Sequence, residues 1–339
     1  MRRSMAAALV LTVLLFGGAY LAAGKTPAQE TVPDGAAQEQ SPQGQRDSGV
    51  ELAVQNGDAV ETMALDVYLQ GVVRGEMPAS FEQEALKAQA AAERTYVYYQ
   101  LAAGRKETHP QADMCTDPAC CNAWLSEEAA REKWGGDFDG WERRIEEAVA
   151  ATDGQVALYD GQPILAVFHS SSAGKTAGAG DVWSGDVPYL RSVDSPEGEE
   201  TVPNYYSAAA FSAAEAKSLL AKAHPELTLS GGPDRWFGAV ERDDSGRVRT
   251  VEVCGTALRG VELRRIFALR SACFTIDASA DEVTFRVTGY GHGVGMSQYG
   301  ANELARQGKT WQEILTWYYA DVTVGPAPEA VQTAESVVN

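Results

Sequence analysis

Apolar residues recur with helical spacing in several segments of the chain, and capping residues mark where some of these segments begin. Serine or threonine followed three residues later by Glu or Gln is a capping box, which occurs here as Ser80 with Gln83, Ser212 with Glu215 and Thr310 with Glu313. The pattern predicts helices over Asp66–Val73, Phe81–Ala103, Trp141–Ala151, Ala213–Ala223 and Trp311–Tyr318.

Shorter apolar runs predict strands, and Asp160-Gly161 is a hairpin turn signal between the first two. The predicted strands are Gln155–Leu158, Ile164–Ser170, Val248–Cys254, Cys273–Ile276 and Val283–Val287. Helices and strands alternate without the regular rhythm of a doubly wound sheet. We therefore expect an α+β fold of mixed helices and an antiparallel-rich sheet, in one elaborate or two-lobed domain.

The two ends of the chain differ from this folded part. Arg2 and Arg3 precede an uncharged apolar run from Met5 to Ala23, so residues 1–24 predict a single-pass membrane anchor with the rest of the chain outside the cytoplasm. An uncleaved anchor is favoured over a cleaved signal peptide. Residues 25–50 are rich in Pro, Gln, Gly and Ser and predict a flexible linker. This leaves 51–324 as the folded domain and 325–339 as a disordered tail.

Charge narrows the range of ligands. The 339 residues carry a net charge of −19, which argues against a nucleic-acid partner and against adhesion to anionic lipid. A neutral or weakly charged ligand fits this composition better than a polyanion.

His109, Cys115, Cys120 and Cys121 lie within thirteen residues of one another and are ligands suited to a tetrahedral zinc site. Disulfide bonding is the alternative, because the domain is expected to face an oxidising space. Five cysteines cannot all pair. If Cys254 and Cys273 pair with each other, three cysteines and His109 remain for a metal with no open coordination position, so its role would be structural. Cys120 is the weakest of the ligands because it adjoins Cys121.

Two further clusters bring several polar side chains together. In residues 289–300, glycines on alternate positions follow a strand and precede a helix, and they present His292, Ser297 and Gln298. The spacing fits neither a dinucleotide loop nor a serine nucleophile elbow. Residues 168–174, which include His169, and the nearby Tyr189 and Arg191 combine hydroxyls, aromatic rings and a cation, as a sugar-binding groove requires. Packing at a tight turn or a sheet edge is the simpler interpretation of both clusters.

Glu76 stands in Gly75-Glu76-Met77-Pro78, on the predicted connection between two helices. Partial desolvation there raises the pKa of a carboxyl and allows it to donate a proton. The ordinary alternative is a solvated surface glutamate.

Together these motifs resemble the stage II sporulation protein D family, the peptidoglycan lytic transglycosylases of endospore-forming bacteria, over residues 51 to 324. The residues that carry the resemblance are Val67-Tyr68-Leu69, Gly75-Glu76-Met77-Pro78, Glu84-Ala85-Leu86-Lys87-Ala88-Gln89-Ala90, Arg94-Thr95-Tyr96, Pro188-Tyr189-Leu190 and Gly291 to Gln298.

The resemblance implies that Glu76 is the catalytic acid and that Arg94 and Tyr189 belong to the substrate groove. Arg191 stands where members often have lysine. It also implies a zinc site of His109, Cys115 and Cys121, with Cys120 where a histidine serves in other members.

The implied reaction cleaves the MurNAc–GlcNAc bond without water and leaves a 1,6-anhydro sugar. One carboxyl suffices because the nucleophile belongs to the substrate, whereas most glycosidases need two. Asp66, Glu82 and Glu84 are the acids close to Glu76 in sequence. No cofactor is needed for this chemistry.

The resemblance further implies a mother-cell membrane protein that faces the septal wall. It would act on glycan strands stripped of stem peptides, beside stage II sporulation proteins P, an amidase, and M, a membrane protein, during engulfment. The main alternative is a non-catalytic wall-binding amidase enhancer, since such proteins share much of this domain. A zinc hydrolase is the third possibility.

Overall fold

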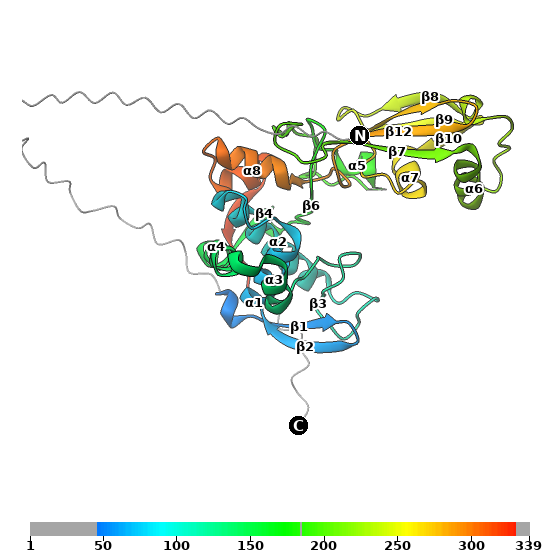
Figure 1. The fold of residues 1–339 in the computed structure, drawn as a ribbon. Helices are drawn as coiled ribbons and strands as arrows, with labels where there is room; N and C mark the ends of the chain where they lie inside the picture. Colours follow the sequence, from blue (N-terminus) through cyan, green and yellow to red (C-terminus); the bar gives the residue numbers. More distant parts are fainter. Residues whose placement is uncertain (1–45, 184, 330–339) are drawn as a thin grey trace, which may run out of the picture. The chain divides into compact units, whose positions relative to one another are not determined.

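The computed structural model describes residues 46–183 and 185–329 (Figure 1). Helices mix with largely antiparallel sheets, so the expected α+β class is confirmed. The helices are α1 Leu65–Glu76, α2 Gln83–Ala103, α3 Glu127–Trp134, α4 Phe138–Ala151, α5 Ala179–Val182, α6 Ala213–Ala223, α7 Gly260–Ile266, α8 Gln298–Arg306 and α9 Trp311–Tyr318, with short 3-10 turns η1 Asp47–Gly49, η2 Gly135–Asp137 and η3 Pro233–Arg235.

Fourteen strands accompany these helices in the described residues. They are β1 Glu51–Asn56, β2 Ala59–Ala64, β3 Met114–Cys115, β4 Gln155–Tyr159, β5 Gln162–Pro163, β6 Phe168–His169, β7 Tyr206–Ser212, β8 Phe237–Arg242, β9 Val248–Val253, β10 Thr256–Arg259, β11 Phe274–Ala278, β12 Glu282–Thr288, β13 Met296–Ser297 and β14 Thr323–Pro326. Two short pairings, β1 with β3 and β6 with β13, are parallel, and the others are antiparallel.

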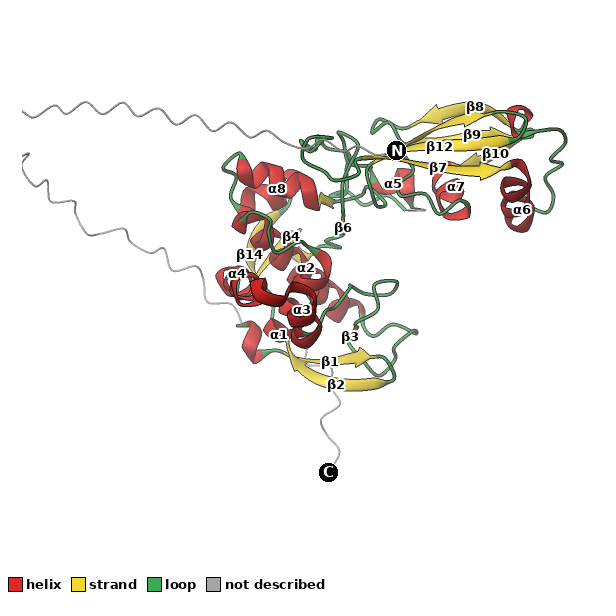
Figure 2. Ribbon diagram, viewed as in Figure 1, coloured by secondary structure: helices red, strands yellow, loops and turns green. Residues whose placement is uncertain are grey.

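The first hydrophobic core is built around α2, which is buried along most of its length. Helices α1, α4, α8 and α9 contact α2, as does β4 of the sheet β14-β4-β5 (Figure 2). Alanines occupy five of the thirteen buried positions of α2, and their small side chains allow neighbouring elements to approach the helix closely. This core positions the candidate site.

The second core lies between the antiparallel sheets β10-β9-β8 and β11-β12-β7 and the helices α6 and α7. Phe285 of β12 is fully buried at its centre and contacts the rings of Phe211, Phe267 and Phe274. Strand β12 alternates buried and exposed residues, as expected for a strand with one face on a core.

All five predicted helices are present, but one predicted cap is wrong. The capping boxes at Ser212 and Thr310 are confirmed. Helix α2 instead has Glu82 as its N-cap, with no side-chain cap. A turn from Pro78 to Phe81 takes up the residues before it, and the amide of Glu82 donates to Asn302 Oδ1 of α8 at 2.7 Å. The partner lies too far along the chain for a local pattern to show it.

One strand prediction and the possible disulfide need correction. Asp160 and Gly161 form the expected turn, with φ of 50° and 75°. The run Ile164–Ser170 forms only the short β6, because the chain leaves the sheet after β5. Cys254 and Cys273 do not form a disulfide: both thiols are free, Cys254 in the turn after β9 and Cys273 before β11.

The folded part extends beyond the predicted limits of 51 and 324. Asp47 is buried, strand β14 runs to Pro326, and the amide of Ala327 donates to the carbonyl of Gly154. The predicted anchor at 1–24 and most of the linker at 25–50 lie outside the described residues. Within the part that is described, no helix is both long and apolar enough to span a bilayer.

Arg94 of α2 does not lie in a groove, contrary to the expectation. It is completely buried, and its guanidinium forms an ion pair with Asp47 at 2.6 Å. It also donates to Thr152 Oγ1 and to the carbonyls of Val149 and Gln155. All three nitrogens of the guanidinium donate hydrogen bonds, and these join α2 to η1, to the end of α4 and to β4. This arginine therefore holds the first core together.

Replacing Arg94 with alanine should destabilise the protein by about 3–5 kcal/mol, because the carboxylate of Asp47 would stay buried without its partner. Urea unfolding followed by circular dichroism measures this loss. Arg191→Ala is the matched control, since its pair with Asp321 is exposed, and its effect should stay within about 0.5 kcal/mol. Equal effects of the two substitutions would refute the structural role of Arg94.

Candidate functional site

Glu76 is the last residue of α1, so it does not lie on a connection between helices as predicted: the helix continues past Val73 and ends because Pro78 follows. One carboxyl oxygen, Oε1, accepts a hydrogen bond from the amide of Ala123 at 2.6 Å. The backbone carbonyl of Glu76 accepts another from Gln298 Nε2 at 2.9 Å. Burial raises the pKa of Glu76, and the Ala123 amide opposes that shift only in part. The carboxyl is thus held in place and retains its proton more strongly than a solvated glutamate does.

The segment that carries Ala123 lies directly on α1. A Cβ atom on Gly71 would stand 2.0 Å from the indole nitrogen of Trp124, and one on Gly75 would stand 2.6 Å from the carbonyl oxygen of Ala123. The amide of Leu125 donates to the carbonyl of Gly71 at 2.9 Å. Two glycines one helical turn apart therefore allow the backbone of 123–125 to reach the end of α1, where it meets Glu76.

Glu76 lines a cavity of about 280 Å³ with Tyr96, Asn122, Phe168 and His292. Burial lowers the pKa of His292 to about 4, so the ring is neutral at physiological pH. Its Nδ1 accepts from the amide of Val294 at 3.1 Å, which leaves the ring proton on Nε2. The cavity thus combines one protonatable carboxyl with aromatic rings and a neutral imidazole. A polar, uncharged ligand fits such a lining.

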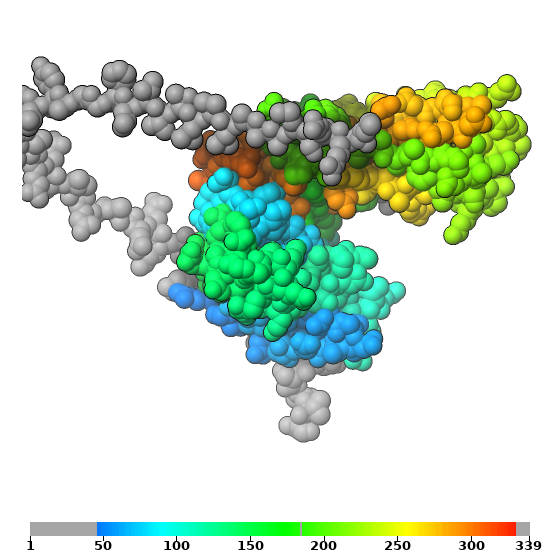
Figure 3. All heavy atoms as spheres, viewed as in Figure 1, coloured from blue at the N-terminus to red at the C-terminus, as the bar shows by residue number. Residues whose placement is uncertain are grey.

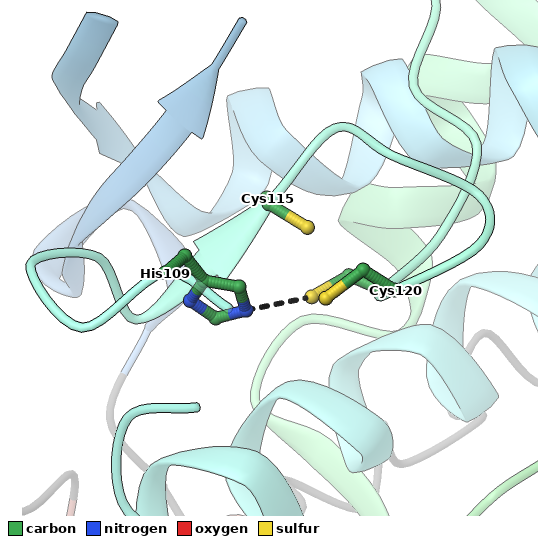
Figure 4. Close-up of side chains that lie close together, drawn as sticks. His109, Cys115 and Cys120 are labelled. Carbon is green, nitrogen blue, oxygen red and sulfur yellow. Dashed lines mark hydrogen bonds between the residues drawn. The ribbon is translucent and has the colours of Figure 1, made fainter. Parts of the chain in front are cut away.

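The fold brings His109, Cys115 and Cys120 close together (Figure 4), and Cys121 belongs to the same cluster. One potential ligand atom from each residue lies within 4.8 Å of all the others. His109 Nδ1 contacts the carbonyl of Ala112, so Nε2 faces the sulfurs and stands 3.4 Å from Cys121 Sγ. Three thiols and one imidazole suit a closed tetrahedral zinc site, and Cys120 belongs to the cluster as fully as the other three.

This cluster lies beside the carboxyl of Glu76, because one segment of chain contributes to both. Cys121 lines the Glu76 cavity, and Ala123, two residues further on, donates the hydrogen bond to Glu76. Lys106 Nζ joins the two regions on another side, since it donates to Tyr96 OH at 3.0 Å and lies 3.5 Å from Cys121 Sγ. Any ion that orders the cluster therefore also orders one wall of the cavity.

Other residues expected in the groove do not line this cavity. His169 and Ser297 are buried in a hydrogen-bond network around Glu197: His169 Nε2 contacts Ser172 Oγ at 2.7 Å, and Glu197 accepts from the Ser172 amide and from Ser297 Oγ. Ser297 is also the N-cap of α8. No sequence motif points to Glu197, because its hydrogen-bond partners come from distant parts of the chain.

Tyr189 and Arg191 also lie apart from the carboxyl. The hydroxyl of Tyr189 accepts from the amide of Leu165 at 2.9 Å, which steadies the segment leading to Phe168 in the cavity wall. Arg191 is exposed and pairs with Asp321 at 3.2 Å. Of the expected groove residues, only His292 lines the cavity, and the side chain of Gln298 donates to the backbone carbonyl of Glu76.

A second carboxyl, Glu93 of α2, lies close enough to Glu76 for the negative charge of Glu76 to raise the pKa of Glu93. Complete burial is the larger cause and raises that pKa well above its ordinary value. Gln89 Nε2 donates to Glu93 Oε1 at 2.8 Å, whereas Oε2 has no partner among the described residues. The acids near Glu76 in sequence, Asp66, Glu82 and Glu84, do not line its cavity. Sequence reasoning missed Glu93, which stands in an ordinary helical run.

Glu93→Gln should stabilise the protein more at pH 8 than at pH 4. The unfolded chain releases this proton near a pKa of about 4.3 while the folded chain retains it, so the stability that Glu93 contributes is lost as pH rises. Glutamine does not titrate, and we expect a difference on the order of 1 kcal/mol, equivalent to roughly one pKa unit. Thermal melts at both pH values measure it. Glu146→Gln on the exposed side of α4 is the control, and an equal gain at both pH values would contradict a neutral Glu93.

Residues 54–159, which include Glu76 and the cysteine cluster, match the family model described as SpoIID, Stage II sporulation protein. Stage II sporulation protein D of Bacillus subtilis (strain 168) is 36% identical over 270 residues, covering 79% of this chain and 76% of that protein. Its counterpart in Bacillus amyloliquefaciens is 35% identical over 79% of this chain and 76% of its own length. An amidase enhancer of Bacillus subtilis is 26% identical over 76% of this chain and 40% of its own length. The long match to both sporulation proteins shows that the chain belongs to the stage II sporulation protein D family.

Proposed function

We propose that this protein is a peptidoglycan lytic transglycosylase that cleaves the bond between MurNAc and GlcNAc in glycan stripped of stem peptides, and that it remodels the septal wall during engulfment in sporulation. The observation that carries the proposal is Glu76: a single carboxyl with a raised pKa, held by the Ala123 amide in a cavity of aromatic and neutral polar groups. Membership of a sporulation family supports the setting.

The reaction needs one acid and one base, and Glu76 serves as both in turn. Its proton goes to the glycosidic oxygen as the bond from that oxygen to the muramyl anomeric carbon breaks. The resulting carboxylate then takes the proton of the muramyl 6-hydroxyl, whose oxygen attacks the same carbon. The products are a 1,6-anhydro sugar and a free 4-hydroxyl, and no water is consumed.

The second carboxyl does not change this assignment. Glu93 is fully buried, so it cannot reach a sugar, and its raised pKa keeps it neutral. It therefore cannot act as the nucleophile or base of a two-carboxylate glycosidase, in which both groups flank the scissile bond. As a neutral group it adds no charge that would shift the pKa of Glu76, so burial remains the cause of that shift.

We propose a structural zinc ion on His109, Cys115, Cys120 and Cys121. Bound there, zinc would crosslink the loop that presents Ala123 to Glu76, with all four positions taken by protein. We also propose that residues 1–24 anchor the protein in the mother-cell membrane with the domain facing the septal wall. Stage II sporulation proteins P and M are its proposed partners.

Glu76→Gln should reduce turnover of denuded glycan by roughly 10²–10⁴-fold, the usual contribution of a general acid and base. The amide oxygen still accepts from Ala123, so the fold is expected to persist. Mass spectrometry of the digest measures anhydromuramyl products. Glu82→Gln, an exposed glutamate before α2, is the matched control and should retain activity.

The similarity to an amidase enhancer provides the second candidate function. Wild-type protein that leaves glycan intact but stimulates an added amidase would establish it and would exclude the transglycosylase.

Purified protein should contain about one zinc ion per chain, measured by elemental analysis. Cys115→Ser should lower both the zinc content and the melting temperature, whereas Cys254→Ser, outside the cluster, should change neither. If a chelator abolishes turnover while the melting temperature stays unchanged, the metal is catalytic and the structural assignment is wrong.

A further inference from the structure

A second cavity meets Glu76 from another side. It encloses about 400 Å³ between the end of α1 and the α3–α4 region, and its walls include Glu76, Lys133, Trp134 and Trp141. This volume falls within the range of about 300–1,000 Å³ typical of small-molecule sites. The cavity of Tyr96, Phe168 and His292 also contains Glu76 in its wall. Glu76 therefore stands between two adjoining spaces.

The lining of this second cavity has the chemistry of a sugar subsite. Trp134 closes α3 and Trp141 lies in the first turn of α4, and both side chains are only partly buried. Neither indole N–H has a hydrogen-bond partner among residues 46–183 and 185–329. Flat apolar rings with free donors at their edges match a hexose, which has an apolar face and a rim of hydroxyls.

Lys133 adds a positive charge at the rim of the cavity. It is exposed, and it has no ion-pair partner in the described part of the chain. The other cation of the cavity, Arg74, is buried and is neutralised by Glu142 of α4. The α3–α4 segment lies at the molecular surface (Figure 3), so a polymer can enter from solvent. One uncompensated cation beside two indoles fits a sugar that carries one negative charge.

We propose that the cavity of Lys133, Trp134 and Trp141 is a subsite for muramic acid whose lactyl carboxylate is free, with the neighbouring sugar in the cavity of Tyr96, Phe168 and His292. The inference rests on the proposed function, since Glu76 at the junction would then face the bond between the two sugars. Only muramic acid without a stem peptide presents that carboxylate to Lys133. The subsite thus explains a selectivity for peptide-free glycan by charge pairing.

Binding to the inactive Glu76→Gln protein tests the subsite without turnover. Calorimetry and tryptophan fluorescence with a peptide-free muramyl tetrasaccharide and with chitotetraose give the affinities. Trp141→Ala and Trp134→Ala should weaken both ligands at least about tenfold. Lys133→Met should weaken the muramyl ligand about tenfold and leave chitotetraose unchanged, because chitotetraose has no carboxylate. Thermal melts check the fold, and Lys133 is exposed, so its replacement leaves packing intact.

Two substitutions serve as matched controls. Trp317→Ala removes an exposed indole from α9, and Lys309→Met removes a partly exposed lysine that lies between α8 and α9 and pairs with Glu313. Both variants should bind as the parent protein does. Unchanged affinity in both tryptophan variants overturns the subsite. Equal losses for the two ligands in Lys133→Met overturn the assignment of the carboxylate, and so does the absence of binding by the parent protein.

The subsite and the proposed reaction can fail separately. If wild-type protein forms anhydromuramyl ends while the Lys133 and tryptophan variants bind as their parent does, the reaction stands and the subsite falls. If those variants lose binding as expected but wild-type protein forms no anhydromuramyl ends, the subsite stands on a wall-binding protein.

Discussion

The close contact between the end of α1 and the segment 121–125 is the constraint on which the candidate site depends. Gly71 and Gly75 leave no side chain between the two backbones, and this brings the amide of Ala123 within 2.6 Å of the carboxyl of Glu76. The same segment begins at Cys121, so one short piece of chain contributes a residue to the ligand cluster and the amide that holds the Glu76 carboxyl. The cysteine loop therefore helps to position Glu76 and is not a separate module.

Two neighbouring residues of α2 show how this core accommodates buried charge. Arg94 is surrounded by Asp47 and backbone carbonyls, and the resulting pair joins four elements. Among the described residues, Glu93 has only Gln89 as a hydrogen-bond partner, and its burial favours the neutral acid. The first solution gives rigidity, and the second avoids a second negative charge beside Glu76. Both residues lie within the core and line neither cavity beside Glu76.

Local patterns predicted what depends on neighbouring residues. The presence of five helices, two capping boxes and the Asp160-Gly161 turn follow from short segments, whereas Glu76 ends α1 and does not lie on a connection between helices. The four metal-ligand candidates were found because they are close in sequence. Features made by distant residues were missed or misplaced: Asn302 at the start of α2, Glu197 among three serines, and Arg94 in the core. The family motifs predicted a set of groove residues, but they did not distinguish residues that are buried in the core from residues that line the cavity.

The central claim is that Glu76 alone cleaves glycan by intramolecular attack, without water. Digestion of denuded glycan in water enriched in heavy oxygen tests it most directly, with mass spectrometry of the new ends. The account predicts 1,6-anhydromuramyl ends that carry no heavy oxygen, because the attacking oxygen is the sugar's own. Reducing ends labelled with heavy oxygen would show that water is the nucleophile and would contradict the account.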